Sequence, residues 1–343
     1  MKKPPIPSFD FIRVLCTFGI VFYHFSCHLA EDAYLPFFAF ANGDWGSALV
    51  VAFFMLSGAS LYYNYSDSLG NGKSSLGLYY YKRWMSIFPM YFLSFFSVEI
   101  IKMISARNIL FRGNPLKYVF TLLGLDGYLT GVVPVAYNLG EWFTGAIIIL
   151  YIIFPLLLFF FKKKPVLTFI GVTVLFILTL NIPIVNPYPF RSITSISMCF
   201  VTGMFFIKYR HIFDRPYCAI PCIAGCLILF IFELPIPTSI VFHLTGVLLF
   251  ISLYTAGRLI MKNRIVSTAF SHLSRISYAV FLTHHVIILI ILKNMSPVKP
   301  LPVLALLCGT TIVILIAAEI LTLLTNVIMR RIDPALRKRL FPS

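Results

Sequence analysis

Two polar side chains stand on the first apolar segment of the chain. Arg13 and His24 close the run RVLCTFGIVFYH. Because an α-helix turns every 3.6 residues, the two side chains lie on one helix face, about 16 Å apart along the axis. Imidazole accepts a proton near neutral pH, as a general base for a hydroxyl must, and guanidinium binds phosphate through two hydrogen bonds. Taken singly, such residues are as often structural, as a snorkelling arginine or a packed histidine.

The composition indicates that these residues lie in a lipid bilayer. Of 343 residues, 59% are hydrophobic and 12% charged, and the mean hydropathy is +0.90. This excess of apolar residues predicts a polytopic membrane protein. The net charge of +16 does not indicate nucleic-acid binding, because the basic residues form short clusters between long apolar runs.

The apolar runs predict an all-α integral membrane bundle of about ten transmembrane helices. Basic residues concentrate at both chain ends and in alternate loops, which predicts that both termini are cytosolic. The spans use almost the whole chain, so we expect a single domain over residues 1–343 with no appended soluble domain. The predicted spans cover residues 10–29, 46–64, 84–105, 142–161, 166–183, 192–207, 217–233, 240–260, 276–293 and 302–328.

Several segments resemble the acyltransferase family 3 membrane proteins. Arginine, ten residues, then histidine in the first helix is similar to the family's signature. Further stretches resemble its second helix, its basic entry to the third helix, its Trp-to-Pro helix and its late Ser-Tyr and His motif. In chain order these are GSALVVAFFMLSGASLYY (46–63), YYYKRWMSIFPMY (79–91), GEWFTGAIIILYIIFP (140–155) and SRISYAVFLTHH (274–285).

The resemblance implies transfer of an acyl group from cytosolic acyl-CoA to a hydroxyl, usually on a glycan at the outer face. It implies that His24 and Arg13 are catalytic, and that acetyl-CoA is the co-substrate, with no permanently bound cofactor and no metal. Both direct transfer and a covalent acyl-enzyme fit these residues. The residues expected to bind the donor are Arg13, Lys82, Arg83 and Ser57, and those expected on the acceptor side or beside His24 are Glu141, Trp142 and His284.

Some positions depart from the family pattern or carry a second interpretation. Ser86 stands where many members have another arginine, and the acid expected after Trp142 is missing, so Glu141 before it is the local carboxylate. For Trp142, a membrane-interface anchor is the default role of that residue type. His284 is equally typical of a hydrogen-bonded core histidine, and His285 is expected to be structural. Gly58, after Ser57, is expected to let a neighbouring backbone approach.

The resulting hypothesis is a multi-pass O-acyltransferase of a bacterial cytoplasmic membrane that modifies a cell-surface or lipid-linked glycan. Polysaccharide synthesis proteins are expected partners, and nucleic acid is not. An alternative is a transporter or flippase for a lipid-linked saccharide or exopolysaccharide, although the inverted repeats of many transporters are not visible here. A non-catalytic assembly factor is a third possibility and would not need His24.

Overall fold

The computed structural model describes residues 3–29, 45–69, 73–106, 116–136, 139, 142–182, 184, 186, 188–232, 234–295 and 299–341. Within these ranges the chain is helical and forms no β-strand. The helices are α1 (Pro7–Cys27), α2 (Gly46–Tyr65), α3 (Lys73–Ala106), α4 (Lys117–Leu122), α5 (Asp126–Leu129), α6 (Trp142–Lys163), α7 (Pro165–Leu178), η2 (Pro189–Arg191), α8 (Ile193–Lys208), η3 (Arg210–Phe213), η4 (Pro216–Cys218), α9 (Ala219–Ile231), α10 (Thr238–Ile260), α11 (Arg264–Asn294) and α12 (Pro300–Leu340).

Each of the ten predicted spans overlaps one of these helices, but not all are long enough to cross a bilayer. Among the described residues, seven helices have the length and composition of a span: α1, α2, α3, α6, α10, α11 and α12. Helices α7, α8 and α9 are shorter; at 1.5 Å per residue, the 14 residues of α7 extend about 21 Å, against a hydrocarbon core of about 30 Å. The predicted range 166–183 extends past the helix, because α7 ends at Leu178 and a turn begins at Thr179.

The tightest helix contact joins α2 to α8. A Cβ atom built on Gly58 would lie 1.9 Å from the carbonyl oxygen of Phe200, and one built on Gly203 would lie 1.9 Å from that of Met55. Only glycine lets the two backbones approach this closely, as at other small-residue interfaces between membrane helices. The structure thereby confirms the expectation that Gly58 admits a neighbouring backbone.

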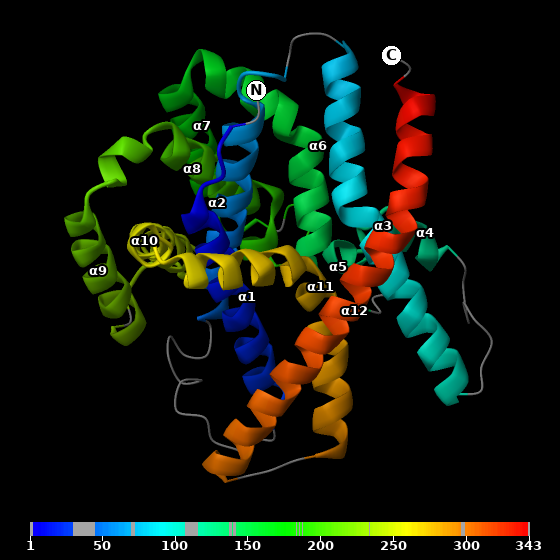
Figure 1. The fold of residues 1–343 in the computed structure, drawn as a ribbon. Helices are drawn as coiled ribbons and strands as arrows, with labels where there is room; N and C mark the ends of the chain where they lie inside the picture. The colour runs from blue at the N-terminus through cyan, green and yellow to red at the C-terminus, as the bar shows by residue number, and fades with distance from the viewer. Residues whose placement is uncertain are drawn as a thin grey trace.

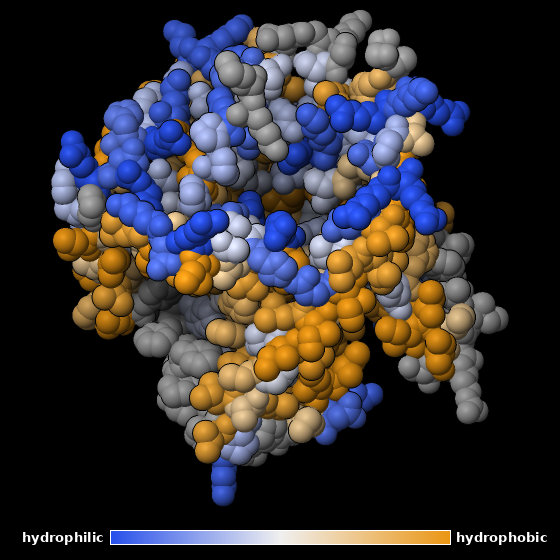
Figure 2. All heavy atoms as spheres, viewed as in Figure 1, coloured by the Kyte–Doolittle hydropathy of each residue, from blue (hydrophilic) through white to orange (hydrophobic). Residues whose placement is uncertain are grey.

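Helix α1 lies between two groups of packed helices. One apolar cluster draws mainly on α2, α6, α8 and α10, the other on α11 and α12, and both α1 and α3 contribute to both. The first part of α11 runs across the bundle and its second part runs beside α12 (Figure 1). The start of α1 and the end of α12 lie at the same end of the molecule (Figure 1). On this face, hydrophilic residues gather toward that end, and hydrophobic residues cover the lower parts of α12 and α9 (Figure 2).

Candidate functional site

A cavity of about 400 Å³ lies among α1, α2, α3, α6 and α11. It is lined by Arg13 and His24, and therefore follows the face of α1 that carries both side chains. Arg83 and Arg275 line the cavity together with Arg13, and His284 lines it together with His24. Ser86 and Arg275 are exposed as well as lining the cavity, so it opens to the surface beside the arginines. Its wall is mainly apolar, with Ile20, Val50, Phe53, Leu56, Phe143 and Ile147.

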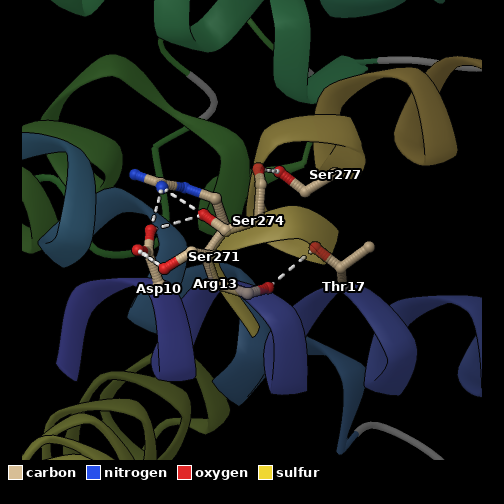
Figure 3. Close-up of polar contacts among 6 residues, drawn as sticks. All are labelled: Asp10, Arg13, Thr17, Ser271, Ser274 and Ser277. Atoms are coloured by element: carbon tan, nitrogen blue, oxygen red, sulfur yellow. Dashed lines mark hydrogen bonds and ion pairs between the residues drawn. The ribbon is translucent and has the colours of Figure 1, made fainter. Parts of the chain in front are cut away.

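The Arg13 side chain is held by polar groups of α1 and α11 (Figure 3). Its Nη1 atom donates to Oγ of Ser274 at 2.7 Å and to Oδ1 of Asp10 at 3.3 Å. The Ser274 hydroxyl in turn donates to the same Asp10 oxygen at 2.6 Å, and Ser271 donates to Oδ2 of Asp10 at 3.0 Å. Asp10 and Arg13 are three residues apart and so lie on one face of α1. This network fixes the guanidinium at the cavity wall and leaves it partly exposed.

Two further arginines lie at the same end of the cavity. The Arg83 guanidinium lies over the rings of Tyr65 and Tyr151, 5.5 Å from each centroid, and its Nη2 atom donates to the Tyr65 hydroxyl at 3.2 Å. Nη2 of Arg275 lies 3.2 Å from Nδ1 of His272, whose Nε2 contacts the carboxylate of Glu319 on α12. Three guanidinium groups thus converge on the open end of the cavity.

The structure separates Lys82 from Arg83. Lys82 is exposed and does not line the cavity, whereas Arg83 does. Successive helical residues point about 100° apart, and of this adjacent basic pair it is Arg83 that faces the cavity. The expectation that Lys82 contributes to this site is therefore not supported by its position.

Two imidazoles line the other end of the cavity. The rings of His24 and His284 lie 5.2 Å apart between centroids. Nδ1 of His284 is 2.7 Å from the carbonyl oxygen of Phe281. Since a carbonyl only accepts, Nδ1 carries the proton, and the buried Nε2 atom keeps a lone pair with no partner among the described residues. His24 is partly buried, and no hydrogen bond from the described residues engages its ring nitrogens.

A second pair of histidines adjoins His24. Nε2 of His28 and Nε2 of His285 lie 3.0 Å apart, so one of them carries the proton that they share. The His285 ring contacts both His24 and His28, with centroid separations of 4.9 and 5.0 Å. His24, His28 and His285 offer ligand atoms that all lie within 4.8 Å of one another, a grouping that can hold a metal ion.

Aromatic groups flank the histidine end of the cavity. Trp142 lines it, and the guanidinium of Arg191 lies 4.6 Å from the ring centroids of both Trp142 and Tyr188. Ser57 also lines the cavity, with its hydroxyl 3.5 Å from that of Tyr151. Glu141, expected on the acceptor side, lies outside the described residues.

Several residues of the site were not anticipated from the sequence. The i,i+3 spacing of Asp10 and Arg13 and the i,i+4 spacing of His24 and His28 are visible in the sequence and could have revealed those pairs. Ser274 and Arg275 begin the motif SRISYAVFLTHH, but nothing in that motif shows that Ser274 meets Arg13 across 261 residues of chain or that Arg275 lines the cavity.

Anion-binding groups lie at one end of the cavity and acid–base groups lie at the other, with a mainly apolar wall between them. Guanidinium groups at the open end can bind phosphate, and imidazoles at the other end can accept a proton from a hydroxyl. Such a site suits a long molecule with a phosphorylated head and a reactive, less polar tail.

Comparison with known proteins agrees with this chemistry. A family model described as an acyltransferase domain matches residues 6–319. The chain therefore belongs to acyltransferase family 3, and the resemblance drawn from its motifs is confirmed. It is a multi-pass membrane protein of a family that transfers acyl groups. No curated protein and no solved structure matches the chain.

Proposed function

We propose that the protein transfers an acetyl group from acetyl-CoA to a hydroxyl of a cell-surface or lipid-linked glycan, with His24 as general base. The single observation that carries this proposal is the cavity that Arg13 and His24 both line, with Arg83 and Arg275 at its open end. The family assignment favours acyl transfer over transport of a saccharide.

The arginines are suited to the donor. The phosphates of CoA are anionic, and Arg13, Arg83 and Arg275 present three guanidinium groups at the open end. We place this end at the cytosolic interface of a bacterial cytoplasmic membrane, because the start of α1 and the basic end of α12 lie on the same side (Figure 1). The thin pantetheine arm then extends along the apolar wall toward His24.

The histidine end is suited to the reaction itself. A ring nitrogen of His24 takes the proton from the acceptor hydroxyl as its oxygen attacks the thioester carbon. The tetrahedral intermediate collapses, the carbon–sulfur bond breaks, and the CoA thiolate leaves and takes up a proton. The products are an O-acetyl ester and CoA. His284 lines the same cavity and helps to orient the reacting groups, because its Nε2 atom has no hydrogen-bond partner in the described part of the chain.

The acceptor enters from the end that Trp142 lines. An indole ring packs well against the apolar face of a sugar, and Arg191 on the same ring adds a positive charge. A glycan on a polyprenyl or other lipid carrier would present its hydroxyl at this depth, and polysaccharide synthesis proteins are its natural source.

The test is acetyl transfer by the purified protein in nanodiscs. Labelled acetyl-CoA is supplied with candidate lipid-linked glycans, and the label is followed into an alkali-labile ester. We expect ester formation by the wild type and its loss in Arg13→Gln. Movement of unmodified glycan across vesicles without consumption of acetyl-CoA would instead favour the transporter hypothesis.

A further inference from the structure

Three histidines from two helices meet beside the histidine end of the cavity. His24 and His28 come from the end of α1, and His285 comes from the second part of α11. One ligand atom from each ring lies within 4.8 Å of the other two. Among the described residues this is the one group of histidine, cysteine, aspartate or glutamate side chains that meets this distance.

The helices bring these rings together for local reasons. His24 and His28 are four residues apart, a spacing that places two side chains one above the other on a helix face. The same spacing supplies two of the zinc ligands in helical metal sites. Helix α11 packs along α1 and carries His285 against both rings.

The ring chemistry suits a divalent transition metal. Imidazole binds Zn²⁺ through a ring lone pair at about 2.0–2.1 Å. Two ligand nitrogens of a tetrahedral site are then about 3.3 Å apart. Nε2 of His28 and Nε2 of His285 are already 3.0 Å apart. Only the wider separations within the group must shrink, and His28 is the one ligand that lies beyond the last residue of its helix, at the C-cap of α1.

We propose that His24, His28 and His285 form a binding site for Zn²⁺, and that Zn²⁺ bound there inhibits acyl transfer. The second half rests on the proposed function, because a His24 nitrogen that ligates the metal cannot take a proton from the acceptor. The first half concerns binding alone and is independent of any activity.

Metal binding tests the first half directly. The full-length protein, with its polyhistidine tag removed, is equilibrated in nanodiscs with Zn²⁺ and the bound metal is measured by mass spectrometry. Co²⁺ serves as a spectroscopic probe of ligand number. We expect one ion per chain in the wild type. His28→Gln and His285→Gln should each weaken binding by about tenfold or more. His211→Gln is the matched control, since His211 is an exposed histidine of η3.

Inhibition tests the second half. The acetyl transfer of each protein is compared with its own rate in a metal-chelating buffer, so that any change in basal activity cancels. We expect Zn²⁺ to inhibit the wild type and His211→Gln at the concentration at which the site fills. His28→Gln should need about tenfold more Zn²⁺ for the same inhibition.

The outcomes separate the two proposals. Absence of Zn²⁺ from the wild type, or equal binding by all variants, overturns the metal site. Binding that depends on these histidines without inhibition leaves the metal site standing and argues against His24 as the base. If the wild type transfers no acetyl group at all, the proposed function fails while the binding measurement still decides the metal site.

Discussion

Neutralising Asp10 should weaken donor binding although Asp10 does not itself line the cavity. Its carboxylate accepts hydrogen bonds from Arg13 at 3.3 Å, from Ser274 at 2.6 Å and from Ser271 at 3.0 Å. In Asp10→Asn the charge is lost and the amide presents a donor to groups that also donate. The Arg13 guanidinium then keeps its hydrogen bond to Ser274 but loses its ion pair, and is held less firmly at the cavity wall.

The size of the effect follows from these contacts. A hydrogen bond to a charged group contributes about 1.5–3 kcal/mol. Loss of the positioning of one of three donor-binding guanidinium groups should cost about the lower value, or roughly tenfold in KM for acetyl-CoA. The turnover number should change much less, because His24 and the acceptor end are untouched.

The assay is steady-state acetyl transfer in nanodiscs over a range of acetyl-CoA concentrations. Asp67→Asn is a matched control, since Asp67 is an exposed acid that pairs with Lys3 and does not line the cavity. Ser274→Ala should raise KM in the same direction. An Asp10→Asn enzyme with the wild-type KM, or one that loses turnover with KM unchanged, would refute the reasoning.

Three further predictions concern packing, the donor site and acid stability. Gly58→Ala should lower the thermal midpoint by several degrees, because the new Cβ would overlap α8 and overpacking costs about 1–3 kcal/mol. Gly171→Ala is the control and should not lower the midpoint, because a Cβ at Gly171 would have no atom within 4 Å among the described residues. An equal decrease in both variants would contradict the packing argument. Arg83→Lys should raise KM for acetyl-CoA by about tenfold with turnover largely unchanged. Lysine keeps the positive charge but lacks the planar guanidinium that binds phosphate through two hydrogen bonds and stacks on Tyr65 and Tyr151. An unchanged KM would show that Arg83 does not bind the donor. A hydrogen bond from Lys3 holds the pKa of Asp67 below its ordinary value, so this pair stabilises the fold at neutral pH, and its contribution is lost as the pH falls through the pKa of the folded state. Because Asp67 is largely exposed, we expect this contribution to be less than about 1 kcal/mol. Acidification should therefore lower the thermal midpoint of Asp67→Asn less than that of the wild type.

The helices were predictable from the sequence because each long apolar run must satisfy its own backbone hydrogen bonds in lipid. The shared face of Arg13 and His24 was predictable for the same reason, since helical periodicity alone sets it. Periodicity does not determine where a helix ends, and so the length of α7 was overestimated at Thr179.

The rest of the site depends on which helices are neighbours. Arg275 and Ser274 reach the cavity only because α11 packs against α1, and no local pattern reports that contact. The adjacent Lys82 and Arg83 were both predicted to bind the donor. Their position in the sequence does not reveal which of the two faces the cavity, and only Arg83 lines it. His285, which the sequence predicts to be structural, lies against His24 and His28.

The most direct test of the central claim is a single-turnover measurement on His24→Gln. Donor binding and acetyl transfer are measured separately, with labelled acetyl-CoA and a glycan that the wild type acetylates. Glutamine keeps a polar side chain of similar size but cannot act as a base. We predict that His24→Gln binds acetyl-CoA with near wild-type affinity and transfers the acetyl group about 10²–10⁴ times more slowly. Transfer at the wild-type rate by a variant that binds the donor normally would contradict the assignment of His24 as the base.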